Sequence, residues 1–408
     1  MSTLETEITL FILLMGGIIL FTILIRYGLR RSRIPSIVGF ILLGIVIRLI
    51  DSRWGFITSG ISEIFEFVAI LGIIILLFRV GLESNLSGLM RQLKPASLIW
   101  IGNVLLSGGL GYVAAYCLLD VAIIPSLFIA VALTATSVAI PVGVWQEAKA
   151  LQSPTGELLV DSAEMDDVSG IILMVLLFAA APILRDGTEI ALAPVLAKEL
   201  GLSLLKLIGL GAVCFLFSRY LEHPITKLFK RLEPANYYPL LVIIAFGFFI
   251  AALAGLVGLS VVIGAFFAGL IFSRDPEAVK QDIPFSTLYE LFTPFFFINI
   301  GLSIDPNTLT MALGMGAILL IAAIVGKVVG SSGPALISND WRSSLLLGIS
   351  MIPRAEIAMV IMHRGLLLGE WAVPNDVFSA MVLVSVATLI ISPIIISLLL
   401  QRWHVRYL

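Results

Sequence analysis

The sequence predicts an all-α polytopic membrane protein with about thirteen transmembrane helices, two inverted six-helix repeats and discontinuous crossing helices five and twelve. Of the 408 residues, 59% are hydrophobic and only 13% are charged, whereas a soluble domain is usually about 25% charged. The apolar runs approach the roughly 20 residues that a helix needs to cross a bilayer. None of them alternates as the strands of a membrane β-barrel do.

The expected spans follow one another with short connections. The first span begins after acidic residues and is too long for the apolar part of a signal peptide, so we interpret it as a true span. The boundary between spans eight and nine rests on Gly258 alone. In chain order the spans cover residues 8–25, 34–50, 62–81, 95–118, 123–146, 155–184, 200–221, 237–257, 258–273, 286–304, 309–337, 343–363 and 377–401.

Lysines and arginines gather in the loops on one side of this bundle. The loop after the first span alone carries Arg26, Arg30, Arg31 and Arg33, and most of the 25 basic residues fall on the same side. Because cytoplasmic loops are the ones enriched in Lys and Arg, we expect the N-terminus outside and the C-terminus in the cytoplasm.

Two pairs of spans contain similar motifs. Span two (VGFILLGIVI) and span nine (IGAFFAGLIF) have two glycines at the same spacing, and Gly81-Leu82 in span three corresponds to Gly301-Leu302 in span ten. Partners seven spans apart run in opposite directions, which predicts two inverted repeats with span seven as a linker. Inverted repeats are typical of secondary transporters, whose sites lie between the repeats near the midplane. The alternative is a chance similarity between glycine-rich helices.

Two adjacent aspartates, Asp166 and Asp167, lie inside the sixth span. A charge near the bilayer centre costs a few kcal/mol or more. Two neighbouring carboxylates should not both stay ionised in a dry site without a cation nearby. These residues are therefore expected to bind a cation, to hold protons, or to do both in turn.

Spans five and twelve, which the repeat makes partners, each contain small and polar residues around a proline, Pro141 and Pro353. Proline removes a backbone donor and interrupts a helix, and non-helical backbone at this depth is tolerated where it is buried or lines a cavity. Paired broken helices in the two halves indicate a transport site. The alternative is a pair of ordinary proline kinks.

Four polar residues from four spans share one depth. At about 1.5 Å of rise per residue, Thr136, Asp166, Lys327 and Arg354 each lie roughly 15–16 Å from the cytoplasmic end of their span. Such a coincidence is not expected of unrelated charges, and it predicts one polar site near the midplane.

The residues of this site can be given different roles. Adjacent helical residues point about 100° apart, so we expect an ion pair between Lys327 and Asp166, with Asp167 as the main carboxylate for cations and protons. Entry of a cation would break the pair and let the lysine release a proton. Snorkelling of Lys327 towards the cytoplasm is the alternative. Hard oxygen ligands suited to Na⁺ or Li⁺ are offered by Thr134, Thr136 and Ser137.

Further charges surround this centre in the sequence. Arg354 and Glu356 can neutralise the ends of the broken helices, or pair with Glu164 or Asp161. Asp161, Glu164 and Asp167 follow one another at three-residue spacing, which predicts either a funnel leading to the site or a plain polar stripe facing the cytoplasm.

Eight motifs in the right order resemble the monovalent cation/proton antiporter superfamily, specifically the bacterial sodium/proton antiporter-like members of the cation/proton antiporter-2 family. They extend over nearly the whole chain. The motifs are IPSIVGFILLG (34–44), LLFRVGLE (76–83), LTATSVAI (133–140), AEMDDVSG (163–170), GLSVVIGAFFAGLIFS (258–273), FFFINIGLSID (295–305), VGKVVG (325–330) and MIPRAEIAM (351–359).

The resemblance implies a homodimer in the lipid bilayer whose core moves like an elevator. It assigns residues 1–92 and 236–306 to a dimerisation domain, 93–185 and 307–408 to the moving core, and 186–235 to the linker helix.

The resemblance also implies residue roles. Asp167 matches the essential ion-binding aspartate, Asp166 the position that is acidic in electrogenic members and Asn in many electroneutral ones, and Lys327 the basic residue of span eleven. This combination looks like the type that exchanges two protons for one Na⁺. Ala355 departs from the pattern, which usually has glycine after Arg354.

These observations together predict a secondary antiporter that exchanges Na⁺ or Li⁺ for H⁺ across a bacterial inner membrane. It is expected not to be an enzyme, and to need no cofactor, no nucleic acid and no soluble regulatory domain in this chain. A K⁺/H⁺ antiporter or K⁺ efflux system is the nearest alternative. An intramembrane aspartyl protease would need aspartates on two helices, and an organic-anion symporter would need a roomier and less acidic cavity.

Overall fold

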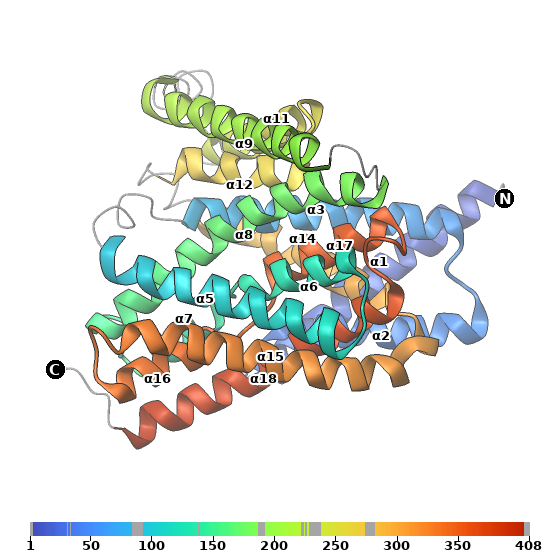
Figure 1. Ribbon diagram of the computed structural model, residues 1–408. Coiled ribbons are helices and arrows are strands. Elements are labelled where there is room, and N and C mark those ends of the chain that lie inside the picture. The colour runs from blue at the N-terminus through green and yellow to red at the C-terminus, as the bar shows by residue number, and fades with distance from the viewer. Residues whose placement is uncertain are drawn as a thin grey trace. The chain divides into compact units, whose positions relative to one another are not determined.

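The computed structural model describes residues 3–30, 32, 34–83, 93–137, 139–186, 192–221, 224, 227, 238–273 and 282–403, and all regular elements in these ranges are helical (Figure 1). The chain divides into two compact units. Unit 1 comprises Met1–Thr22, Asp51–Asn85 and Thr188–Asn299, and unit 2 comprises Ile23–Ile50, Leu86–Gly187 and Ile300–Leu408.

The helices follow in chain order as α1 (Thr3–Leu29), α2 (Ser36–Trp54), α3 (Ser59–Glu83), α5 (Leu93–Val113), η1 (Ala114–Leu118), α6 (Ile123–Thr134), α7 (Ala139–Glu147), α8 (Pro154–Asp186), α9 (Leu192–Leu216), η2 (Phe217–Leu221), α11 (Tyr238–Leu256), α12 (Val261–Phe272), α14 (Asp282–Leu302), η3 (Pro306–Thr308), α15 (Leu309–Ala335), α16 (Trp341–Ser350), α17 (Glu356–Leu368) and α18 (Asn375–Arg402).

Each predicted span coincides with a helix, and spans five and twelve coincide with the pairs α6–α7 and α16–α17. Among the described residues, eight helices are long and apolar enough to cross a membrane, and α6, α11 and α12 are shorter apolar helices. The total of thirteen crossings stays a prediction. So does the orientation, because many of the basic residues that it depends on lie in 84–92, 228–237 and 274–281, outside the described residues.

The weakest predicted boundary, at Gly258, is a real one. Helix α11 ends at Leu256 and α12 begins at Val261. Gly258 has a φ of +81°, in the left-handed region that glycine adopts most readily. Ser260 caps the new helix by accepting a hydrogen bond from the backbone N–H of Val262.

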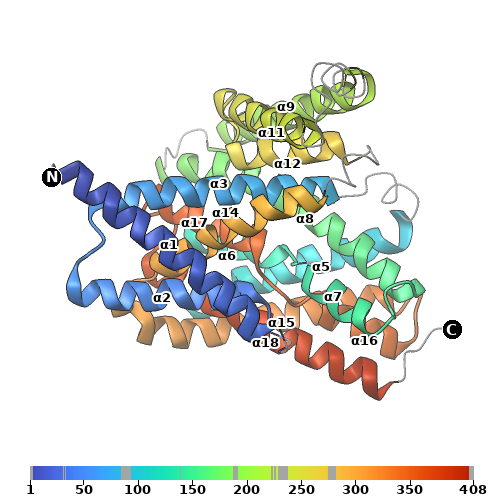
Figure 2. The ribbon, with the colours of Figure 1, turned by 180° about the vertical axis from the view of Figure 1, so that it is seen from behind.

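In unit 1, α12 packs against α3 and α11 (Figure 2). The helices α3 and α12 touch through glycines, because a Cβ atom on Gly81 would collide with the carbonyl of Phe266, and one on Gly269 with the carbonyl of Phe78. Any side chain at these two positions would push the helices apart.

Unit 2 contains a matching crossing, in which a Cβ atom on Gly301 would collide with the carbonyl of Ile41 and lie 2.9 Å from the Cα of Gly44. Gly81 contacts α12 close to Gly269, and Gly301 contacts α2 close to Gly44, so the motif pairs noted in the sequence make equivalent contacts. The inverted repeat as a whole remains a prediction. Unit 2 also includes residues 23–50, which the sequence assigns to the dimerisation domain, and that assignment likewise stays a prediction.

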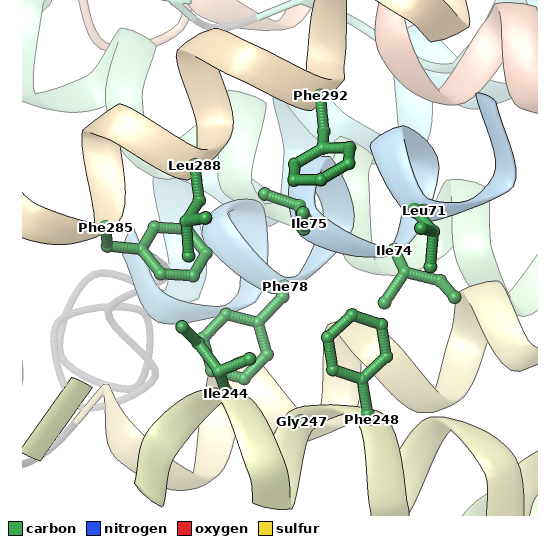
Figure 3. Close-up of a pocket in the computed structure, with 10 residues that line it drawn as sticks. All are labelled: Leu71, Ile74, Ile75, Phe78, Ile244, Gly247, Phe248, Phe285, Leu288 and Phe292. Atoms are coloured by element: carbon green, nitrogen blue, oxygen red, sulfur yellow. The ribbon is translucent and has the colours of Figure 1, made fainter. Parts of the chain in front are cut away.

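Unit 1 has a partly open apolar pocket of about 150 Å³ between α3, α11 and α14 (Figure 3). Its lining contains no polar side chain, and Figure 3 shows aromatic rings from all three helices turned towards one another. A cavity with this lining offers nothing to hold an ion. The lining residues are Leu71, Ile74, Ile75, Phe78, Ile244, Gly247, Phe248, Phe285, Leu288 and Phe292.

The helices α5 and α15 of unit 2 lie side by side (Figure 1). We call their glycine contact the α5–α15 seam, formed by Gly102, Ser107, Gly326 and Gly330. A Cβ atom on Gly102 would lie 2.6 Å from the carbonyl oxygen of Gly330, and one on Gly326 would lie 2.8 Å from the Cα of Ser107. The two backbones are therefore in contact along the seam, next to Lys327.

Candidate functional site

The interruptions predicted in spans five and twelve are both present. Helix α6 ends at Thr134, and Ala135 after it is extended, with φ −66° and ψ 149°. Helix α16 ends at Ser350 and α17 begins at Glu356. The backbone N–H of Ser137 donates to the carbonyl of Pro353 at 2.9 Å, so the two breaks are hydrogen-bonded to each other.

The prolines act differently in the two breaks. Pro353 lies inside its break, where it supplies no N–H and disfavours helical geometry in the residue before it. Pro141 lies in the first turn of α7, where a missing N–H costs no helical hydrogen bond. In span five it is therefore the extended residue Ala135 that marks where the helix is interrupted.

Lys327 reaches from α15 to the first break and is fully buried. Its ammonium donates to the carbonyl of Thr134 at 2.6 Å, to Oγ1 of Thr136 at 2.7 Å and to Oδ2 of Asp166 at 2.8 Å. All three N–H donors of an ammonium are thus used. The predicted ion pair with Asp166 is present, and the alternative in which Lys327 snorkels is wrong for this structure.

Asp166 on α8 is held asymmetrically. Besides Lys327, its Oδ2 accepts from Oγ1 of Thr136 at 2.6 Å and from Nδ2 of Asn103 at 2.5 Å. Its other oxygen, Oδ1, is buried and has no hydrogen-bond partner among the described residues. Three donors therefore converge on one carboxylate oxygen, and the other makes no hydrogen bond within the described residues.

Asp167 has different surroundings from its neighbour, as the 100° between adjacent helical residues predicts. It is half-buried, whereas Asp166 is fully buried. Asp167 interacts electrostatically with the carboxylates of Asp166, Glu164 and Glu356 and with the ammonium of Lys327. Four carboxyl groups beside one lysine concentrate negative charge, and this charge attracts cations.

The remaining predicted oxygen ligands differ in availability. The hydroxyl of Thr134 donates to the carbonyl of Val131 in its own helix at 2.8 Å, so Thr134 faces Lys327 with its carbonyl only. The hydroxyl of Ser137 is buried without a hydrogen-bond partner among the described residues, and so is Oδ2 of Asp161. Asp161 and Glu164 are half-buried on α8, and their funnel role stays a prediction.

Arg354 lies in the second break and is almost fully buried. Its Nη1 donates to the carbonyls of Ala135 at 2.7 Å and Met351 at 3.2 Å, and its Nη2 lies 3.4 Å from Oγ of Ser107. Ala135 and Met351 follow the C-terminal ends of α6 and α16, where helix dipoles place partial negative charge. Of the two roles predicted for Arg354, the structure has the one at the helix ends.

Sequence reasoning missed four polar residues around the site. Asn103 donates to Asp166 and Ser107 accepts from Arg354. On α18, Thr388 accepts from the backbone N–H of Arg354 at 3.2 Å, and Ser385 donates to its carbonyl at 2.5 Å. An amide inside an apolar span, as in IGNVLL, is expensive unless it is hydrogen-bonded, and this signal could have identified Asn103.

A family model described as "sodium/hydrogen exchanger, transmembrane" matches residues 17–402. The high-affinity Na⁺/H⁺ antiporter NhaS3 of Synechocystis is 30% identical over 82% of this chain and 71% of its own length. The Na⁺/H⁺-K⁺ antiporter GerN of Bacillus cereus is 27% identical over 88% of each chain.

A solved structure has a similar fold. The sodium proton antiporter MjNhaP1 from Methanocaldococcus jannaschii superposes with a TM-score of 0.69, covering 98% of this chain and 97% of that one at 16% identity. At this identity the superposition shows that the two chains share a fold.

Proposed function

Because this chain belongs to the sodium/hydrogen exchanger family, a family of integral membrane transporters, we propose that it exchanges Na⁺ or Li⁺ for H⁺ at the site around Asp166 and Asp167. The observation that carries the proposal is the buried ion pair between Lys327 and Asp166, next to Asp167 and between two broken helices. Oxygen ligands, negative charge and a displaceable ammonium meet there, as exchange requires.

Competition between ions supplies the chemistry. When Asp167 binds a cation, protons leave the carboxyl groups because the added positive charge favours their ionised forms. A cation that also contacts Oδ1 of Asp166 weakens the attraction between that carboxylate and Lys327, and the lysine gives up a proton in the low-dielectric site. One proton from Asp167 and one from the pair make the exchange electrogenic, with two protons for one Na⁺.

The wider proposal rests on the family resemblance of the motifs. We propose a homodimer in a bacterial inner membrane, with the N-terminus outside and the C-terminus in the cytoplasm. The core carries the site between the two sides by an elevator movement, and it needs no cofactor. The glycine crossings of α3 with α12 and of α2 with α14 are compatible with helices that move as packed bodies.

K⁺/H⁺ exchange is the second candidate. The name of the relative GerN from Bacillus cereus includes both Na⁺ and K⁺, and this supports K⁺ as a possible transported ion. Both ions take oxygen ligands, so the choice between them depends on how closely the oxygens of Asp166, Asp167 and Ser137 can approach one ion.

The test uses purified protein in proteoliposomes with an imposed pH gradient and an internal pH dye. Na⁺, Li⁺ or K⁺ is added with and without a clamp on the membrane potential, and Asp167→Asn serves as the matched control. Dequenching by Na⁺ or Li⁺ that depends on the potential and is absent in the variant supports the proposal. A response to K⁺ alone would identify K⁺ as the transported ion. A response that does not depend on the membrane potential would overturn the ratio of two protons to one Na⁺. No response to any ion would refute exchange.

A further inference from the structure

We propose that Asn103 is a positioning residue for exchange, whose amide holds Oδ2 of Asp166 in place when Lys327 leaves it. The inference deepens the proposed function and rests on it. Asn103 lies on α5, which contributes none of the residues that the sequence placed in the site, and its side chain is fully buried.

Departure of Lys327 does not affect the other donors to Asp166 equally. Three groups donate to Oδ2 of Asp166, namely Lys327, Thr136 and Asn103. The hydroxyl of Thr136 also accepts from Lys327, so its orientation changes when the ammonium departs. The amide of Asn103 has no contact with Lys327 among the hydrogen bonds described, and it cannot lose its proton. It is the donor that stays constant through the cycle.

The backbone at Asn103 is held in place by close contact with α15. Its neighbour Gly102 meets Gly330 in the α5–α15 seam, and a Cβ atom on Gly330 would lie 3.0 Å from the Cα of Asn103. The backbone at Asn103 is therefore pressed against α15 and cannot follow the carboxylate. A fixed donor resists rotation of Asp166, so Oδ1 keeps its orientation for a cation or proton.

Only the donor half of the Asn103 amide has a partner. Its Oδ1 is buried and has no hydrogen-bond partner among the described residues. An unsatisfied buried acceptor is destabilising, so the amide carries this penalty in order to present its N–H groups to Asp166. Departures of this kind are expected at functional positions.

The experiment compares Asn103→Leu, which keeps the branched shape in a somewhat larger side chain but removes the donor, with wild type in the proteoliposome assay. The control is Ser126→Ala, which removes an equally buried hydrogen bond, from Ser126 to the carbonyl of Val121, at the far end of α6. Asn103→Ser repeats the loss of the amide in a smaller side chain if the leucine variant does not fold. Thermal melting and gel filtration establish folding.

We expect Asn103→Leu to raise the Na⁺ concentration for half-maximal exchange by about tenfold, the usual effect of losing a hydrogen bond to a charged group. The maximal rate should fall less than the apparent affinity. Wild-type affinity in a folded Asn103→Leu variant would overturn the proposal, and so would an equal change of affinity in Ser126→Ala.

A second measurement separates this proposal from the proposed function. Lys327→Ala, Asn103→Leu and the double variant are compared by thermal melting, which needs no transport. Groups that share Oδ2 of Asp166 should show non-additive losses, whereas additive losses would contradict a shared carboxylate. If wild type exchanges no ion, the proposed function fails while this cycle still decides whether Asn103 holds Asp166.

Discussion

The two broken helices contribute differently to the site. After α6 the carbonyls of Thr134 and Ala135 each accept from a cation that comes from the second half of the chain. After α16 the carbonyl of Met351 also accepts from Arg354, but this break supplies that cation itself and is followed by the acidic residue Glu356 in the first turn of α17. Neither break is complete without the other.

This difference follows the helix dipoles. Carbonyl ends carry partial negative charge and favour Lys327 and Arg354, whereas the N-terminal end of α17 carries partial positive charge and favours Glu356. The charged residues of the site thus serve the backbone as well as the ion. A cation that displaces Lys327 from Asp166 leaves the carbonyl of Thr134 available, so ion binding and the structure of the first break are linked.

The largest expected effect tests whether the acids beside the breaks carry exchange. Asp167→Asn removes the half-buried carboxylate and should lower exchange at least 100-fold, with an unchanged melting profile, since the amide has the same shape. The dye assay with Na⁺ measures it. Asp305→Asn, at a half-buried carboxylate outside the site, is the matched control. Substantial exchange in the Asp167 variant would contradict the assignment of the ion site.

Lys327→Ala removes the cation that contacts the first break and leaves Arg354 in the second break unchanged. It leaves Asp166 as a buried carboxylate without its counter-charge, which typically costs about 3–5 kcal/mol of unfolding free energy. Thermal melting in detergent should show a clear drop. Adding Asp166→Asn should restore part of the loss, and a double variant as unstable as Lys327→Ala would show that the ion pair is not what stabilises the break.

Arg354→Gln affects both breaks at once. The shorter side chain loses the hydrogen bonds to Ala135 and Met351, each from a charged donor, and we expect a loss of roughly 2–3 kcal/mol in stability together with reduced exchange. Arg342→Gln, on the exposed part of α16, should change the melting temperature little. Equal effects of the two substitutions would mean that the helix ends do not need Arg354.

The smallest effect concerns the far end of α16, which distinguishes the second break from the first. Asp340 caps α16 by accepting from the backbone N–H groups of Arg342 and Ser343, whereas Ala122 before α6 offers no such side chain. Asp340→Ala should cost about 1 kcal/mol. Circular dichroism on heating would measure it, with Glu63→Ala, at an exposed position of α3, as the control.

The same cap has a pH dependence. Hydrogen bonds from Ser343 and from the backbone hold the pKa of Asp340 below its usual range. A carboxyl whose pKa is depressed in the folded state stabilises it above the unfolded pKa and loses that contribution as the pH falls through the folded pKa. Wild type should therefore lose the cap's small contribution only in acid below about pH 4, and Asp340→Ala should lack this step.

The predictable part of the site came from charges and prolines. A lysine, an arginine and two aspartates in apolar spans are so costly that they had to meet, and their common depth indicated where. Proline and small residues in TATSVAIP and MIPRAE predicted the interruptions. These inferences need only the chain's own periodicity and the cost of burying charge.

The rest depends on packing between distant helices. Asn103 meets Asp166 because α5 packs against α8 as well as α15. The glycines that bring α5 and α15 together are not distinguished in sequence from other glycines of membrane spans. The hydroxyl of Thr134 prefers the carbonyl of Val131 in its own helix, a local choice that leaves the backbone as its contribution to the site. Arg354 could reach several acceptors, and the position of α6 decides among them.

The α5–α15 seam has a mechanical consequence. Asn103 follows Gly102 and Lys327 follows Gly326, so two of the three donors to Asp166 are mounted on backbones that touch. The spacing between these two backbones therefore sets how far apart the Asn103 and Lys327 side chains lie around the carboxylate of Asp166. Gly330→Ala would have to move α5, since its Cβ would lie 2.8 Å from the carbonyl oxygen of Gly102. We therefore expect this methyl group to change the preference between Na⁺ and K⁺ without contacting either ion. Comparing the Na⁺ and K⁺ responses of the variant with those of wild type measures the change.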